Sequence, residues 1–81
     1  MNLDQAIQLA KKEVKDPNAL VYLNAIPKAI EGWGSEGLES QIMYALCNMK
    51  SWRGENARQA KLVMNNWLKE FRKNAQASMV A

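Results

Sequence analysis

The sequence predicts an all-α fold, a compact bundle or orthogonal array of about four helices. Three observations predict it. Apolar residues recur at spacings of three and four, no segment alternates with a period of two, and short turns containing Pro, Gly and Asn divide the chain. Because 81 residues suffice for only one domain, we expect a single helical domain over residues 1–73 and a flexible tail over residues 74–81.

The first helix is predicted to begin after Asn2, which is a favourable N-cap residue. Gln5 lies three residues later, in the position that completes a capping box. The apolar residues that keep helical spacing are Leu3, Ala6, Ile7, Ala10 and Val14. Asp16 and Pro17 should end this helix and start the next, with Asp16 as N-cap and Pro17 at the first helical position.

The second helix is predicted to run from Pro17 towards Ile30, but Pro27 interrupts it. Proline removes one backbone donor and crowds the preceding turn, so we expect a kink or a break near Ile26. The Gly-Trp-Gly segment 32–34 predicts a stop, and Ser35 is the predicted N-cap of the third helix.

The third helix, predicted over residues 36–49, is apolar nearly all round. One face carries Leu38, Ile42, Ala45, Leu46 and Met49. Outside that face lie Met43, Tyr44 and Cys47. Such a helix belongs in the centre of the fold or at a subunit interface, and a homodimer through its surplus apolar surface is one expectation.

The fourth helix, predicted over residues 55–72, carries two stripes that point in different directions. The apolar stripe is Ala57, Ala60, Met64, Trp67 and Phe71. The basic stripe is Arg58, Lys61, Asn65, Lys69 and Arg72. The predicted common core of the last two helices and their turn is Leu38, Ile42, Leu46, Met49, Trp52, Met64, Trp67 and Phe71.

Composition argues against an enzyme. The chain has no His and one Cys, so Cys47 has no histidine partner for nucleophilic catalysis, and the commonest metal ligand is missing. We therefore expect no catalytic residues, no metal and no cofactor. The first residues show neither a basic segment nor an apolar run typical of a secretion signal, and no stretch has the apolar length of a membrane span. A cytoplasmic protein that does not act in a membrane is expected.

The net charge of +3 is divided unevenly along the chain. Residues 1–40 carry four Lys against six Asp or Glu, which gives −2, and residues 41–81 carry seven Lys or Arg against two Glu, which gives +5. Such polarity can steer an anionic partner, but the preferred interpretation is a solvated helix surface that has to be covered with charged residues.

The segment 42–55 also resembles a pattern in small phage and prophage proteins. In that pattern an apolar helix ends in an Asn, a turn reads Trp-Arg-Gly-Glu, and an amphipathic helix containing Ala follows; here the turn is Trp52 to Glu55. The resemblance covers roughly residues 36–73 and extends loosely to the amino-terminal end. It implies a phage or prophage origin, hence the host cytoplasm, and a protein that binds a host or phage protein. It carries no functional residue over.

Two candidate sites follow from the residues. The candidate partner-binding residues are Met43, Tyr44 and Arg53; Arg53 could lie against Trp52 and be offered to a carboxylate or phosphate, or Trp52 could simply fill the corner between two helices. The candidate basic face is Arg58, Lys61, Lys69 and Arg72. We expect a non-enzymatic protein that binds another protein. The alternatives are a nucleic-acid-binding accessory protein that uses the basic face, and a structural subunit of a phage assembly.

Overall fold

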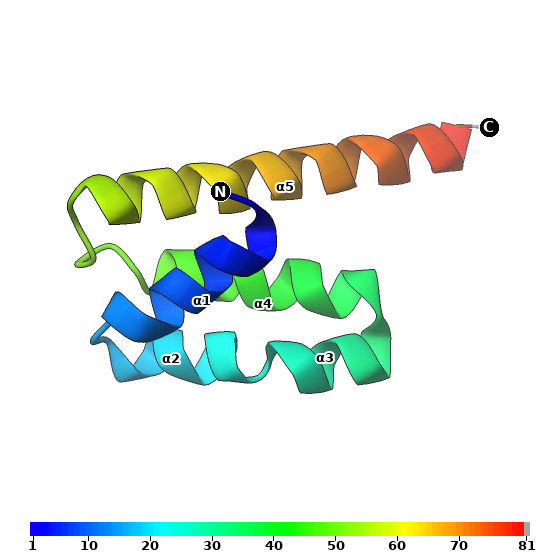
Figure 1. Ribbon diagram of the computed structural model, residues 1–81. Helices are drawn as coiled ribbons and strands as arrows, with labels where there is room; N and C mark the ends of the chain where they lie inside the picture. The colour runs from blue at the N-terminus through cyan, green and yellow to red at the C-terminus, as the bar shows by residue number, and fades with distance from the viewer. Residues whose placement is uncertain (81) are drawn as a thin grey trace.

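The computed structural model describes the backbone of residues 1–80. It describes the side chains of these residues except those of Ala29 and residues 75–80. The predicted all-α fold is confirmed (Figure 1). The helices are α1 (Leu3–Glu13), α2 (Pro17–Asn24), α3 (Ile26–Trp33), α4 (Ser35–Cys47) and α5 (Glu55–Val80). The described part of the chain therefore has five helices rather than about four, because the predicted second helix is divided in two.

The first two helices begin where the sequence predicts. The Asn2 side chain accepts a hydrogen bond from the Gln5 backbone N–H (2.8 Å), and the Gln5 side chain accepts one from the Asn2 N–H (2.9 Å), which completes the capping box. Asp16 caps α2 by accepting from the Asn18 N–H at 2.9 Å, and Pro17 occupies the first turn.

The predicted interruption at Pro27 is confirmed as a break. Ala25 is both the C-cap of α2 and the N-cap of α3. Pro27 lies in the first turn of α3, where a backbone N–H has no partner within the helix, so the missing N–H of proline costs no helical hydrogen bond. Gly34 ends α3 with a φ of 63°, a conformation that favours glycine. Gly34 is also the N-cap of α4, so the prediction of Ser35 as N-cap is wrong: no side chain caps this helix, and the glycine turn sets its start.

The helices are arranged as an antiparallel stack. Figure 1 shows α4 running back along α2 and α3, and α5 running back again along the other side of the molecule. α1 packs mainly on α5, whereas α3 packs on α4 and on the neighbouring α2 alone among the described residues. The longest dimension is 42 Å and reflects α5, whose 26 residues give a helix of about 39 Å.

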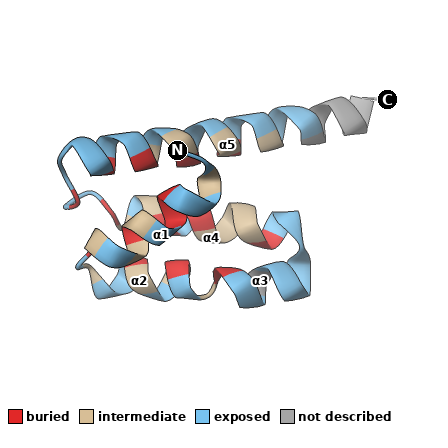
Figure 2. Cartoon of the chain, in the orientation of Figure 1, coloured by how far each residue is buried: buried red, intermediate tan, exposed pale blue. Residues whose placement is uncertain are grey.

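The core lies between α1, α2, α4 and α5, and the outer sides of α3 and α5 are exposed (Figure 2). Its fully covered large side chains are Leu23, Ile42, Met49 and Met64. Of the other residues predicted to share this core, Trp52 is buried, and those that are half-buried against it are Leu38, Leu46 and Trp67. Phe71 is half-buried outside the core cluster, stacked on Trp67 with 5.2 Å between ring centroids.

The end of the last helix corrects one prediction. α5 is continuous to Val80, so the predicted end at Arg72 is wrong; the missing apolar period after Phe71 does not stop a helix that has no Gly or Pro to end it. Residue 81 and the side chains of residues 75–80 lie outside the described residues. The flexibility expected for the 74–81 tail therefore stays a prediction. None of the described helices combines the length and the apolarity needed to cross a bilayer.

Candidate protein-binding surface

The surplus apolar surface predicted for the third helix is present on α4. Tyr44 is 47 % exposed, and Cys47 is also exposed. The Tyr44 ring packs against Tyr22 of α2, with centroids 5.3 Å apart and planes tilted by 31°. Met43 is half-buried against the core, on another side of α4. Of the two predicted partner-binding residues on α4, Tyr44 is thus the more exposed, and the Tyr22 ring packs against it.

Trp33 is the most exposed large apolar side chain in the described part of the protein, at 76 %. It closes α3 and stands beside two shallow hollows. The smaller, of about 220 Å³, is lined by Trp33, Glu36, Gly37, Ser40 and Gln41. The larger, of about 420 Å³, is lined by Ala25, Lys28, Gly32, Trp33 and Gln41. Trp33 therefore borders one depression on α4 and a second one between α3 and α4.

These aromatic side chains belong to one side of the molecule. On α4, Gly37, Gln41 and Tyr44 are three and four residues apart, so they follow one another along one face of the helix. Trp33 adjoins the start of this row and Tyr22 adjoins its end. We call this surface the aromatic face, defined by Tyr22, Trp33, Gly37, Ser40, Gln41 and Tyr44.

The turn before α5 is structural rather than part of this face. Trp52 is 8 % exposed, and its indole Nε1–H donates to the Glu13 carboxylate of α1 at 3.2 Å. Lys61, not Arg53, lies over the Trp52 ring, with its Nζ 6.0 Å from the centroid. The interpretation of Trp52 as a corner-filling aromatic is confirmed. Arg53 is exposed, but no described contact brings it to Met43 or Tyr44, so the three predicted partner-binding residues do not form one site.

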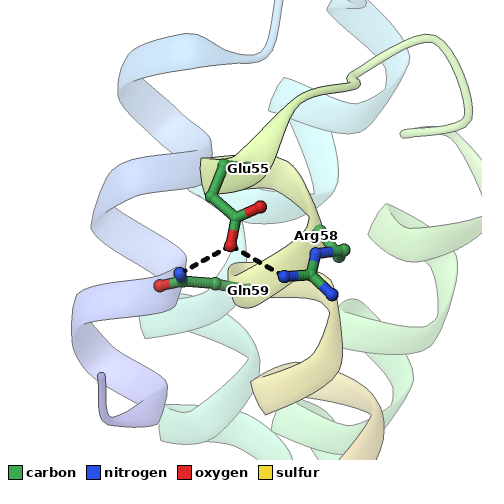
Figure 3. Close-up of polar contacts among 3 residues, drawn as sticks. All are labelled: Glu55, Arg58 and Gln59. Atoms are coloured by element: carbon green, nitrogen blue, oxygen red, sulfur yellow. Dashed lines mark hydrogen bonds and ion pairs between the residues drawn. The ribbon is translucent and has the colours of Figure 1, made fainter.

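The amino-terminal end of the basic stripe is neutralised locally. Glu55 Oε1 accepts hydrogen bonds from Arg58 Nη2 at 2.8 Å and from Gln59 Nε2 at 3.0 Å (Figure 3). The hydrogen bond from Arg58, then that from Gln59, and the charge of Arg58 lower the pKa of the Glu55 carboxyl below its ordinary value. The same carboxylate raises the pKa of the Arg58 guanidinium. Arg58 is therefore already paired on an open surface.

Further along the stripe, Lys61 also makes a hydrogen bond within the protein. Its Nζ donates to the Trp52 carbonyl oxygen at 2.6 Å, in a half-buried position. Arg72 reaches across to α4, where its Nη2 lies 3.3 Å from the Met43 sulfur. A hollow of about 410 Å³ runs along the carboxyl-terminal part of α5, lined by Asn65, Leu68, Lys69, Arg72 and Lys73. On α5, the cations that are open to a partner are therefore those that line this hollow, at the carboxyl-terminal part of the helix.

Sequence reasoning missed Trp33 as a site residue. The usable signal was its position between Gly32 and Gly34, because a large aromatic at a glycine-flanked helix end has few neighbours to cover it. Sequence reasoning also missed an apolar groove of about 310 Å³ between α1 and α3. Its apolar lining residues are Leu3, Ile7, Ile26, Pro27, Ile30 and Leu38.

No group of His, Cys, Asp and Glu side chains within the described residues is arranged to hold a metal ion. Searches of protein family models, curated proteins and solved structures find no match to this chain. The resemblance to small phage proteins therefore stays an expectation from the sequence.

Proposed function

We propose that this protein acts without catalysis or cofactor, by binding another protein through the aromatic face. The observation that carries the proposal is the gathering of Trp33, Tyr44 and Tyr22 on one side of a small helical domain. Trp and Tyr are enriched among the residues that dominate binding energy at protein interfaces, because they bury a large area at a low entropic cost. A Trp that is 76 % exposed leaves most of that area available to a partner.

The surroundings of these aromatics suit the same role. Ser40 and Gln41 are half-buried beside Trp33 and supply hydroxyl and amide groups next to its apolar ring. This mixture of aromatic anchors and a polar rim is typical of protein interfaces. The chemistry of the chain favours binding over catalysis, because the sequence has no His to serve as a base.

The proposal includes an origin and a place of action. The resemblance of segment 42–55 to small phage and prophage proteins supports a phage-type protein that meets a host or phage protein in the host cytoplasm. A second copy of the chain is one possible partner for the same face, since the homodimer expectation concerned the α4 surface on which Tyr44 lies.

A pull-down from host lysate, performed with and without nuclease, tests this function. We expect a specific protein to survive nuclease and to be lost with Trp33→Ala and with Tyr44→Ala. Leu62→Ala is the matched control, because Leu62 is 58 % exposed but lies on α5, away from the aromatic face. Circular dichroism should show the same helicity for all three variants. Capture that is unchanged in both aromatic variants would contradict the proposal.

A specific observation keeps nucleic acid as the second candidate. Within the described residues the only ion pair is Arg58–Glu55, so Lys69, Arg72 and Lys73 have no carboxylate partner around their shared hollow. Three neighbouring cations of this kind can contact a phosphate backbone. The rings of Trp67 and Phe71 stack on each other on a different side of α5, so they do not extend this basic hollow as a platform for bases.

A further inference from the structure

We propose that the hollow on the carboxyl-terminal part of α5 is a second contact for a partner protein and that it takes an acidic segment of that partner. The inference rests on the proposed function, because it takes the partner to be a protein. We call this surface the basic hollow; its lining residues are Asn65, Leu68, Lys69, Arg72 and Lys73. A concave surface that carries charges of one sign favours a ligand of the opposite sign.

The positive charges of the basic hollow have no carboxylate beside them. The only Asp or Glu in residues 65–81 is Glu70, which does not line the hollow. At about 100° per residue, Glu70 lies about 160° round the helix from Arg72. Within the described residues the only ion pair is Arg58–Glu55, which lies at the other end of α5. A ligand in the hollow therefore meets three cations whose charge is not cancelled by the protein.

The guanidinium of Arg72 is held by a neighbour that leaves its charge intact. Arg72 Nη2 donates to the Met43 sulfur of α4 at 3.3 Å. A thioether sulfur is a weak, neutral acceptor, so the other N–H groups of Arg72 can still form a forked pair with a carboxylate. The Asn65 amide already donates to the Lys61 carbonyl oxygen at 2.9 Å, so the cations are the principal donors to a ligand.

The short extent of the basic hollow favours carboxylates of a protein over a nucleic-acid backbone. Lys69 and Lys73 lie one helical turn apart, with Arg72 between them in the sequence, so the cations span only about 6 Å along α5. The track of cations does not continue towards the start of the helix, because Lys61 donates to a backbone carbonyl and Arg58 is in an ion pair. Two or three carboxylates fill this length, whereas a nucleic acid gains affinity from a longer series of phosphate contacts.

A peptide titration of the full chain at physiological salt, followed by NMR, tests the proposal. The probes are a short peptide rich in Glu and the same peptide with every Glu replaced by Gln. We expect saturable shifts of Lys69, Arg72 and Lys73 with the Glu peptide alone. Physiological salt screens charges that are more than about 8 Å apart, so the titration reports contact with the hollow rather than net charge.

A pair of double variants separates the basic hollow from the overall charge. Lys69→Gln with Lys73→Gln should weaken binding of the Glu peptide by about two- to thirtyfold, the range for two exposed ion pairs. Arg72 is kept, so its contact with α4 is undisturbed. The matched control is Lys12→Gln with Lys28→Gln, which removes the same charge from exposed positions on α1 and α3. This control should bind the Glu peptide as the natural sequence does.

Four results would overturn the assignment of an acidic protein segment. These are equal binding of the Gln peptide, an equal loss of affinity in both double variants, and no saturable shift of Lys69 or Lys73 with the Glu peptide. The fourth is tighter binding of a short DNA duplex than of the Glu peptide at the same salt, which would make phosphate the ligand of the hollow.

The pull-down distinguishes this failure from a failure of the proposed function. If capture requires Trp33 and Tyr44 but is unchanged by Lys69→Gln with Lys73→Gln, protein binding through the aromatic face stands and only the role of the basic hollow falls. If capture is unchanged by Trp33→Ala and Tyr44→Ala, the proposed function falls, whatever the peptide titration shows.

Discussion

Trp52 and Trp33 show how one residue type serves two purposes in this chain. Trp52 lies in the turn after α4, and Trp33 is the last residue of α3. Trp52 is buried and donates its indole N–H to Glu13 of α1, whereas Trp33 lies beside residues of α3 and α4 and is 76 % exposed. The indole of Trp52 satisfies its N–H inside the fold, as a buried Trp must. The indole of Trp33 is open to water and available for recognition.

This contrast predicts opposite effects of the same substitution. Trp52→Ala should reduce the free energy of unfolding by about 3–5 kcal/mol, the usual cost of truncating a buried large aromatic. Trp33→Ala should change it by no more than about 0.5 kcal/mol, because the side chain is 76 % exposed. Urea denaturation followed by circular dichroism measures both. A Trp33 variant as unstable as the Trp52 variant would show that Trp33 packs inside the fold and would remove it from the candidate surface.

At the scale of the helix, the sequence predicted starts and interruptions better than ends. The capping box at Asn2, the Asp16-Pro17 start and the break near Pro27 are all local, so neighbouring residues determine them. The end of α5 has no comparable local signal, and the apolar pattern stopped before the helix did.

The burial pattern of α5 depends on its neighbours as well as on its own sequence. Ala57, Ala60 and Met64 are buried as predicted, but the next buried residue is Leu68 rather than Trp67. At about 100° per residue, Leu68 lies 40° from Met64 and Trp67 lies 60° from it on the other side. Both positions fit an apolar stripe, and only the packing against α1 and α4 decides which of them is covered.

The basic stripe of α5 contains two lysines in different surroundings: Lys61 is half-buried and hydrogen-bonded, whereas Lys69 is exposed. The two can be compared by the same substitution. Lys61→Ala should lower the free energy of unfolding by about 1.5–3 kcal/mol, because a charged donor to the Trp52 carbonyl is lost. Lys69→Ala, on the same helix and exposed, should change it by no more than about 0.5 kcal/mol. Thermal and urea unfolding compare the two variants. Equal stabilities would mean that the Lys61 hydrogen bond contributes nothing and that the whole stripe is a solvated face.

At the scale of the whole molecule, the sequence predicted one part of the candidate site. Tyr44 was identifiable because α4 has more apolar surface than one face can bury. Its assembly with Tyr22 and Trp33 was not, because it depends on α2 and α3 lying side by side with α4. The break at Pro27 matters here: it ends α2 and starts α3, and the glycine turn at Gly34 then sends α4 back along both helices.

The uneven charge of the molecule bears on the choice between its two candidate partners. Of the seven cations in residues 41–81, Arg58 is paired with Glu55, Lys61 is bound to a backbone carbonyl, and Arg72 lies against Met43. Of the other four, Lys69 and Lys73 lie at the carboxyl-terminal part of α5, and Lys50 and Arg53 lie in the turn before this helix. The cations left for a partner are therefore divided between two places rather than spread along the predicted stripe. A short basic patch makes fewer phosphate contacts than a full-length stripe, and affinity for nucleic acid falls as the number of phosphate contacts decreases.

We therefore expect no tight binding of DNA or RNA at physiological salt. A salt titration by fluorescence anisotropy should show weak association that disappears as salt rises. In the Lys69→Gln, Arg72→Gln, Lys73→Gln variant, the slope of log affinity against log salt on duplex DNA should decrease by up to about three, one per lost phosphate contact. Lys61 is left unchanged in this variant because its loss would disturb the fold. Tight binding at physiological salt that vanishes in the triple variant would instead make nucleic acid the principal partner, with the aromatic face in a secondary role.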